Sequence, residues 1–320
     1  MRRTMLNGHP FPARWTAAGL LAVGFLAVQA WAQQPGQKTF GSPEEACAAL
    51  VEAARSQDPR ALLDLLGAQG RRIAASGDPA EDANHRADFV RRYQEMHRLV
   101  QEPDGRTTLY IGAYNWPTPI PLAQKDRAWY FDTEAGLREI LYRRIGRNES
   151  SAIRVCEELA EAQKEYYAAR NHEYARSLFS AEGQRDGLYW KAAEGEPPSP
   201  IGPLVARAVA HGYPHSLEGG PAPFRGYFFR ILGAQGRHAP GGARSYLIQG
   251  RMTGGFAFVA YPAQYRSSGV MTFIVGQDGV VRQKDLGRRT RALAGTLAAY
   301  DPDPTWAPAE LGGSPRQAKP

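Results

Sequence analysis

The sequence predicts an α+β protein, with N-terminal helices packed on a small sheet and then a long helix against an antiparallel sheet. Two observations lead to this prediction. Segments with helical spacing and capping signals open each half of the chain, and short runs of β-branched and aromatic residues follow them. A length of 320 residues is enough for two domains. We expect two units, at residues 41–147 and 148–305.

In the first unit, capping signals mark where helices begin. Ser42-Pro43 and Asp58-Pro59 each join a side chain that can cap a helix to a proline that suits its first turn. These signals predict one helix that ends near Arg55 and another that ends at Gly67. Apolar residues at helical spacing predict a third helix over residues 83–99.

Two strands and a further helix complete the first unit. β-Branched and aromatic residues predict strands at residues 107–114 and 128–131. The segment between them, residues 116–122, carries alternate prolines, which favour an extended, polyproline-like path. Asp132 is placed to cap a helix that runs to about Ile145.

The second unit begins with a predicted helix from Asn148 to about Arg170. Residues 182–223 then form a segment rich in proline and glycine, and loops of this length often serve as lids or binding loops. Strand-like runs follow at residues 226–232, 244–249, 255–261, 270–275 and 280–283. The last two runs are joined by Asp278-Gly279, a good hairpin signal, and a helix over residues 290–300 closes the unit.

The two ends of the chain differ in composition from the folded part. Residues 1–32 have the pattern of an export signal, because three arginines precede an apolar run and Ala30-Trp31-Ala32 supplies small residues for cleavage. An arginine pair near the start also resembles a twin-arginine signal, so two export routes stay open. We expect residues 33–40 and 306–320 to be disordered.

These features predict a periplasmic or secreted protein. The apolar run of the signal is too short to span a bilayer comfortably. No later segment approaches the roughly 20 apolar residues that a spanning helix needs. We therefore expect no transmembrane span after the signal is removed.

The net charge bears on nucleic-acid binding, and the positions of the cysteines bear on disulfide formation. The formal net charge of +7 is mild and its arginine doublets are scattered, unlike the clustered basic surface of a nucleic-acid-binding protein. Cys47 and Cys156 both occupy apolar positions of predicted helices. This placement favours buried free thiols over a disulfide between them, although an exported protein permits either state.

The sequence contains no familiar catalytic motif. It lacks the nucleophile elbow, the zinc-protease helix motif, the phosphate-binding loop and closely paired cysteines. His211 and His215 lie close together, but Pro214 prevents a helix from aligning them. We therefore expect neither a metal site nor another cofactor.

Two charged clusters have two interpretations each. The predicted helix from Asn148 carries four glutamates, at Glu157, Glu158, Glu161 and Glu165. A solvated face balanced by Arg154 and Lys164 explains them better than acid–base catalysis. Four arginines near the junction of the units, Arg138, Arg143, Arg144 and Arg147, either pair with those glutamates or grip an anionic ligand.

Aromatic residues around the proline-rich segment make the best candidate recognition surface. With the neighbouring arginines, the candidate surface consists of Tyr114, Trp116, Trp129, Arg143 and Arg144. Aromatic anchors on a rigid loop suit binding. The competing interpretation places both tryptophans in the core of the first unit, where aromatic side chains are often found.

Several long strings of the sequence resemble a known bacterial family. The strings WPTPIPL, GYFFRILGAQG, GGFAFVAYPAQY and SGVMTFIVGQDGVV closely resemble the domain of unknown function DUF2950, over roughly residues 38–308. The resemblance implies a secreted or envelope protein and supplies no catalytic residues. The second unit also resembles the globular heads of type IV pilin-like proteins, without their apolar prepilin stretch, and the opening helices are similar to NTF2-like domains.

We expect an exported envelope protein that binds or assembles, without catalysis, and whose partner is an envelope protein or a small ligand. The alternative is an envelope hydrolase or small-molecule enzyme with a site built from residues 182–223, including His211 or His215. A structural role as a pilin-like piece of an envelope assembly is the third hypothesis. A fold by itself does not decide among them.

Overall fold

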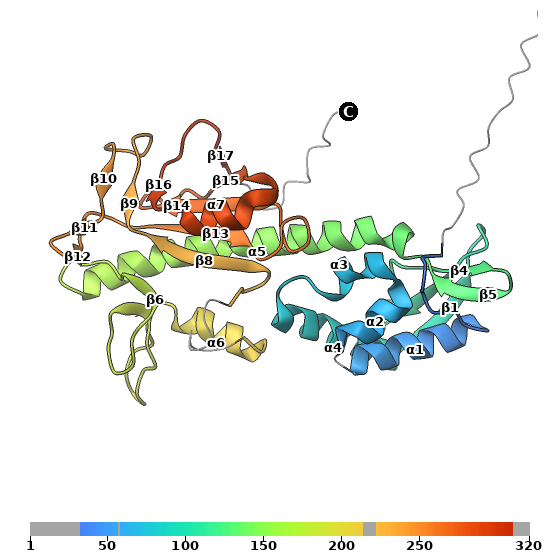
Figure 1. Cartoon of the computed structure of the whole chain (residues 1–320). Helices are drawn as coiled ribbons and strands as arrows, with labels where there is room; N and C mark the ends of the chain where they lie inside the picture. The colour runs from blue at the N-terminus through green and yellow to red at the C-terminus, as the bar shows by residue number, and fades with distance from the viewer. Residues whose placement is uncertain (1–32, 57, 214–221, 310–320) are drawn as a thin grey trace, which may run out of the picture. The chain divides into compact units, whose positions relative to one another are not determined.

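The computed structural model describes residues 33–56, 58–213 and 222–309, and its elements are shown in Figure 1. Helices and strands are mixed and the two largest sheets are antiparallel, which confirms the predicted α+β class. The buried apolar core residues form two clusters, one within residues 40–131 and one within residues 152–300. All the described residues belong to one compact unit. The division at residues 147 and 148 stays a prediction.

The first helices begin at the predicted capping signals. α1 (Pro43–Arg55) and α2 (Pro59–Leu66) follow Ser42 and Asp58, whose side chains each accept a backbone N–H of the first turn. Gly67 ends α2 with a φ of 70°, a conformation that favours glycine. A short helix, α3 (Arg71–Ala74), follows.

The next helix, α4 (Pro79–Glu95), differs at both ends from the helix predicted over residues 83–99. It begins earlier because Asp78-Pro79 repeats the cap-and-proline signal, and the Asp78 carboxylate accepts a backbone N–H of the first turn. It ends earlier because Met96 is extended and the following residues form β1 (His97–Gln101). The helical spacing of apolar residues thus extends beyond Glu95, where the chain forms a strand.

The first sheet has the strand order β1-β2-β4-β5, with β3 paired to β2. Its remaining strands are β2 (Thr107–Ile111), β3 (Trp116–Pro117), β4 (Leu122–Lys125) and β5 (Ala128–Phe131). Helices α1, α2 and α4 contact this sheet. β2 and β5 lie within the predicted strands, and the proline-rich segment runs between β3 and β4.

A single helix, α5 (Thr133–Ala169), replaces the two helices that the sequence predicts in this region. Asp132 caps it as expected. Asn148, which we placed at the start of a second helix, lies inside α5 and is buried. Its side-chain amide donates to Glu81 Oε2 at 3.2 Å and to the Ser268 carbonyl at 3.0 Å, so it makes tertiary contacts instead of capping a helix.

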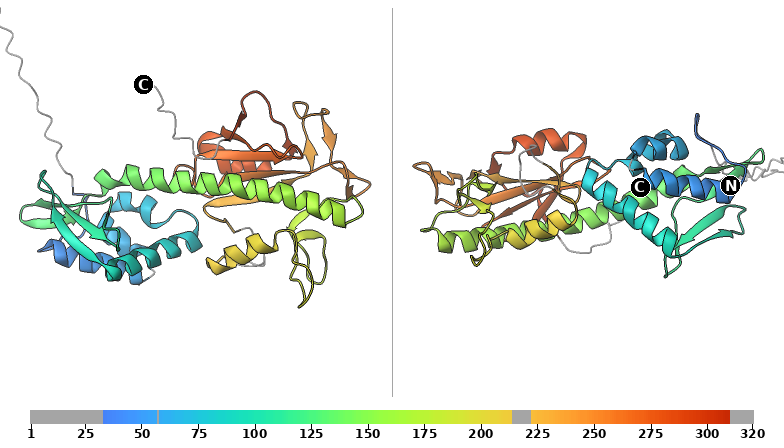
Figure 2. Two further views of the ribbon diagram at one scale, coloured as in Figure 1. Left: turned by 180° about the vertical axis from the view of Figure 1, so that it is seen from behind. Right: turned by 90° about the horizontal axis from the view of Figure 1, so that it is seen from below.

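The second large sheet lies between two helices. Its strands are β8 (Tyr227–Leu232), β13 (Ala257–Pro262), β14 (Met271–Gly276), β15 (Arg282–Asp285) and β17 (Ala307–Pro308), in the order β17-β15-β14-β13-β8. α5 and α7 (Thr290–Thr296) contact β13 from opposite sides, as the right-hand view of Figure 2 shows. Residues 257–260 of β13 are therefore all buried. The predicted hairpin at Asp278-Gly279 joins β14 to β15.

The segment that we expected to be a loop is partly structured. Residues 182–223 contain β7 (Gly187–Tyr189) and α6 (Gly202–Ala210), whereas residues 214–221 lie outside the described part. The other short strands are β6 (Ser177–Phe179), β9 (Ala234–Gln235), β10 (Arg244–Ser245), β11 (Leu247–Ile248), β12 (Arg251–Met252) and β16 (Ala299–Tyr300).

The leader that we expected to be disordered packs against the first cluster. Gln37 is 5% exposed, and its side-chain amide donates to the carbonyls of Leu65 and Phe131 at 2.8 and 2.7 Å. Phe40 is buried in the same cluster. The prediction of disorder is wrong for residues 37 and 40, because a polar glutamine can supply donors to buried carbonyls. Of the expected tail, residues 306–309 are described and include β17.

Cys47 and Cys156 are buried in separate clusters and are free thiols. Burial raises the pKa of the Cys47 thiol to about 12, so this thiol is unreactive at neutral pH. None of the helices formed by the described residues has both the length and the apolar character needed to cross a membrane.

Candidate functional site

A groove follows the proline-rich segment between β3 and β4. Pro117, Pro119 and Pro121 have a fixed φ and no N–H group, so the segment is stiff without a ladder of hydrogen bonds. The intervening Thr118 donates its N–H to the Leu109 carbonyl on β2 at 2.7 Å. This contact holds the segment along the first sheet.

The first turns of α5 form the other side of the groove. A Cβ added to Gly136 would lie 2.2 Å from the carbonyl oxygen of Pro119, so only glycine permits this close approach. Residues three and seven positions further along a helix share the face of the first. Glu139 and Arg143 therefore stand beside the proline segment, where they form an ion pair of 2.6 Å.

We expect Gly136→Ala to destabilise the protein, which reverses the usual effect of this change in a helix. Alanine normally stabilises a helix interior by about 1 kcal/mol relative to glycine. Here the new methyl group overlaps the Pro119 carbonyl, and overpacking of this kind costs about 1–3 kcal/mol. Gly146→Ala is the matched control, because nothing lies within 4 Å of its added Cβ. If urea unfolding shows that both changes stabilise equally, the packing of the proline segment on α5 is wrong.

The cavity of the groove has a volume of about 350 Å³. Its lining comes from β2 and the turn before it, from the proline segment and from α5: Glu102, Arg106, Thr108, Tyr110, Pro117, Thr118, Pro119, Pro121, Ala135, Glu139 and Arg143. Each side thus presents one acidic and one basic side chain. Proline and tyrosine rings supply the apolar surface between them.

An ordered turn carries exposed aromatic side chains beside the groove. Tyr114 is 87% exposed and Trp116 is 52% exposed. Asn115, which has a φ of 55°, accepts a hydrogen bond from Arg98 Nε at 2.8 Å. The Arg98 guanidinium also lies 4.8 Å from the centre of the Tyr110 ring. Because these contacts fix the turn before a partner binds, less conformational entropy is lost on binding.

The structure separates the residues that we predicted as one surface. Arg143 lines the groove, and Tyr114 and Trp116 precede its first proline in the chain. Trp129 lies on β5 and packs against the first hydrophobic cluster, as the competing interpretation expected for it. Arg144 is only 4% exposed and serves a different set of contacts, described below.

Three charged residues of the groove were missing from the predicted surface. Glu139 precedes Arg143 by four residues, and this helical ion-pair spacing is a signal that the sequence already contained. Glu102 and Arg106 flank the turn at residues 103–105, and pairing of β1 with β2 brings them together. Their position beside the prolines depends on the sheet, so no local pattern indicated it.

Over residues 37–309, the sequence matches the family model described as Protein of unknown function (DUF2950). The chain belongs to the DUF2950 family. The match includes every residue of the groove and both hydrophobic clusters. No curated protein and no solved structure matches the chain. The likeness to pilin-like heads and to NTF2-like domains therefore stays a prediction.

In this DUF2950 protein, Arg144 lies in a buried polar network. Its Nη1 and Nη2 atoms donate to the carbonyls of Arg72 and Ile73, at the α3 segment, over 2.7 and 2.6 Å. Burial lowers the pKa of the Arg144 guanidinium, and the nearby carboxylates of Asp82 and Glu81 partly offset this shift. Arg144 therefore holds α3 and α4 to α5 and is not available to a ligand.

Asp78 is the second centre of this network and is 0% exposed. One carboxylate oxygen accepts hydrogen bonds from the Tyr213 hydroxyl at 2.8 Å and from the Gly226 N–H at 2.7 Å. The other accepts the Glu81 N–H at the start of α4 at 3.1 Å. Asp78 thus caps α4 and also links it to two segments that follow much later in the chain.

The same network shifts the pKa values of two neighbouring side chains. Burial, with the nearby Asp78, raises the pKa of Glu81 to about 7. Burial, with the charge of Arg147, lowers the pKa of His85 to about 4. Shifted pKa values are frequent at functional sites. Here Asp78, Glu81 and Asp82 are each at most 8% exposed, so we assign the network a structural role.

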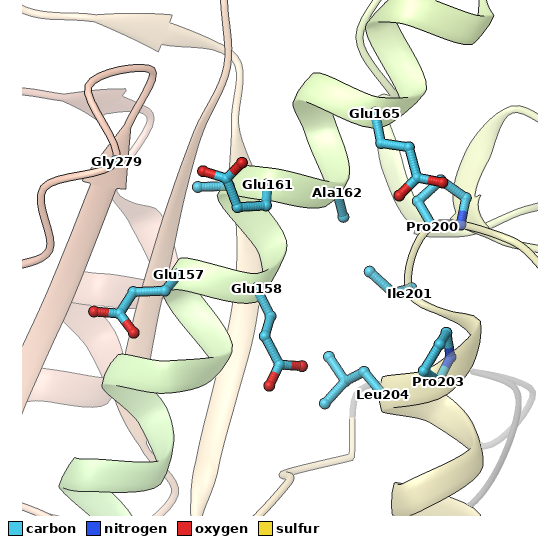
Figure 3. Close-up of a pocket in the computed structure, with 11 residues that line it drawn as sticks. Glu157, Glu158, Glu161, Ala162, Glu165, Pro200, Ile201, Pro203, Leu204 and Gly279 are labelled. Carbon is cyan, nitrogen blue, oxygen red and sulfur yellow. The ribbon is translucent and has the colours of Figure 1, made fainter.

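The four glutamates of α5 border a second cavity, with a volume of about 410 Å³ (Figure 3). In the close-up, Glu158 and Glu165 point toward residues 200–204, whereas Glu157 and Glu161 point away from them. Glu161 pairs with Lys164 at 2.7 Å, and Glu158 pairs with Arg207 of α6. These ion pairs support the interpretation of a balanced, solvated helix face.

His211 and His215, the histidines named in the enzyme hypothesis, do not form a site among the described residues. His211 is exposed at the end of α6, and its backbone carbonyl accepts a hydrogen bond from Asn84 at 2.7 Å. His215 lies outside the described residues. In the described part of the chain, no three histidine, cysteine or acidic side chains converge as a metal site requires.

Proposed function

We propose that the protein is an exported, non-catalytic binding module of the bacterial cell envelope. In this proposal, the groove beside the proline segment captures an extended polypeptide segment of another envelope protein. The main support is the exposure of Tyr114 and Trp116 on an ordered turn next to a cavity. Large exposed aromatic side chains are frequent anchors of protein interfaces.

The lining of the groove favours a polypeptide as the ligand. A cavity of about 350 Å³ accommodates a few side chains and not a folded domain. Glu139 with Arg143 lines one side and Glu102 with Arg106 the other, so the groove presents both charges to the side chains of a ligand. Arg106 is held in place by an ion pair with Asp104. The proline and tyrosine rings add apolar contact along the segment.

The export part of the proposal rests on the pattern of residues 1–32, with arginines, an apolar run and a small-residue cleavage motif. Cleavage near Gln33 leaves Gln37 and Phe40 in the mature chain, where both pack against the first cluster. The partner is accordingly expected among envelope proteins, in the periplasm or outside the cell.

Photo-crosslinking in intact cells tests this function. A photoreactive amino acid replaces Tyr114 beside the groove, and the matched control carries it at Ile248, which is 51% exposed on β11. We expect a discrete adduct with an envelope protein from position 114, and its loss when Arg143→Glu is added. No adduct from position 114, or the same adduct from position 248, would overturn the groove as the binding face.

A further inference from the structure

We infer that a second cleft, at the C-terminal end of α5, binds an acidic saccharide. The cleft has a volume of about 610 Å³ and is built from residues 166–177, 184–186 and 251. It shares no residue with the proline groove. The inference therefore concerns a site and a ligand class that are independent of the proposed function.

Positive charge dominates the lining of the cleft. Its four guanidinium groups belong to Arg170, Arg176, Arg185 and Arg251, against the two carboxylates of Glu173 and Asp186. Arg251 pairs with Glu173 at 2.9 Å, and Arg185 pairs with Glu196, which is not part of the lining. Arg170 and Arg176 then stand against the single carboxylate of Asp186. Arginine recognises carboxylate and phosphate groups with two parallel hydrogen bonds. We therefore expect the excess of arginines over carboxylates to bind an acidic group.

Stacking orders two of the guanidinium groups before a ligand arrives. The guanidinium carbons of Arg170 and Arg185 lie 5.5 and 5.6 Å from the centre of the Trp190 ring. Arg170 also lies 5.8 Å from the ring of Tyr166, whose hydroxyl donates to the Arg185 carbonyl at 2.8 Å. A guanidinium held against an aromatic face loses less freedom on binding than a free surface arginine.

The remaining polar groups distinguish a saccharide from a simple anion. Asp186, Gln184 and Asn171 line the same cleft, and they offer carboxylate and amide groups to a ligand. A small inorganic anion can contact the arginines but has no group that donates to the Asp186 carboxylate. Sugar hydroxyl groups donate to carboxylates and amides and also accept from guanidinium groups, so an acidic sugar uses the whole lining.

Isothermal titration of the full mature protein tests the inference with three probes: a galacturonic acid tetramer, a neutral galactose tetramer and inorganic sulfate. We expect the acidic tetramer to bind, and to bind at least roughly tenfold more tightly than either other probe. Arg170→Gln and, separately, Arg176→Glu should weaken this binding by a similar factor. Arg288→Glu, a charge reversal at an exposed arginine outside the cleft, should leave it unchanged.

Each remaining outcome contradicts the inference. Equal binding of sulfate and the acidic tetramer would reduce the cleft to an unspecific anion site. Equal binding of the neutral tetramer would remove the role of the arginines. No binding of any probe at millimolar concentration, or binding that neither arginine variant weakens in a protein that melts normally, would mean that the cleft is not a saccharide site. Arg176 is exposed, so its variant tests the site without a folding defect.

Discussion

Arg144→Ala is expected to lower the free energy of unfolding by about 3–5 kcal/mol, the usual cost of removing one partner from a buried charged network. The change leaves the carbonyls of Arg72 and Ile73 without their donors and removes one of the two arginines, Arg144 and Arg86, that act on the Asp82 carboxylate. The sequence analysis placed Arg144 on a candidate binding surface, whereas the structure buries this side chain, which is 4% exposed.

The neighbouring Arg143 provides the matched control for this prediction. Its ion pair with Glu139 lies on the helix surface, where such pairs contribute about 0–1 kcal/mol. Urea unfolding of Arg143→Ala should therefore nearly match the wild type, while Arg144→Ala unfolds at much lower urea. Similar midpoints for the two variants would contradict the structural role of Arg144.

Glu81→Gln is expected to raise the free energy of unfolding at pH 8 by up to about 3 kcal/mol. Glu81 is buried, and its pKa is about 7 in the folded protein against an ordinary value of 4.5. Between these values the folded state binds more protons than the unfolded state. Wild-type stability therefore falls as the pH rises from 4.5 through 7, because a buried carboxylate must ionise. The glutamine variant avoids this cost.

The difference between variant and wild type should be near zero at pH 5 and largest at pH 8. His85 has the opposite effect, because its lowered pKa removes stability as the pH falls from 6.5 towards 4. Both proteins retain His85, whose Nε2 lies 3.7 Å from Glu81 Oε1. With a pKa of about 4, His85 stays neutral in the folded state between pH 5 and 8, so its contribution largely cancels in the comparison. Glu157→Gln, at an exposed position of α5, is the control. A difference that does not change with pH would show that Glu81 is ionised normally.

The elements that the sequence predicted well are those whose signals are local. Ser42-Pro43 and Asp58-Pro59 placed two helix starts, and Asp278-Gly279 placed the β14–β15 hairpin. Asp78-Pro79 carries the same signal as the first two, and reading it would have placed the start of α4. Capping and turn residues act on their own neighbourhood, so their effect survives without knowledge of the fold.

The elements that the sequence did not predict depend on distant contacts. Residues 97–99 were predicted as the end of a helix but pair with β2. Asn148 was predicted as a helix start but donates to Glu81 and Ser268. The candidate site shows the same division. The aromatic residues Tyr114 and Trp116 lie next to the proline-rich segment in the sequence, so they could be chosen as candidates without the fold. The burial of Arg144 depends on its contact with α3.

The most direct test of the groove as a binding face is capture of the tagged full-length protein from the cells that produce it, after brief chemical crosslinking. Three proteins are compared: the wild type, the double variant Trp116→Ala/Arg143→Glu, and the control Ile248→Ala/Arg288→Glu. We predict that the wild type and the control capture the same envelope protein, that the groove variant loses it, and that all three unfold at similar urea concentrations. Capture that survives in a folded groove variant would contradict the account.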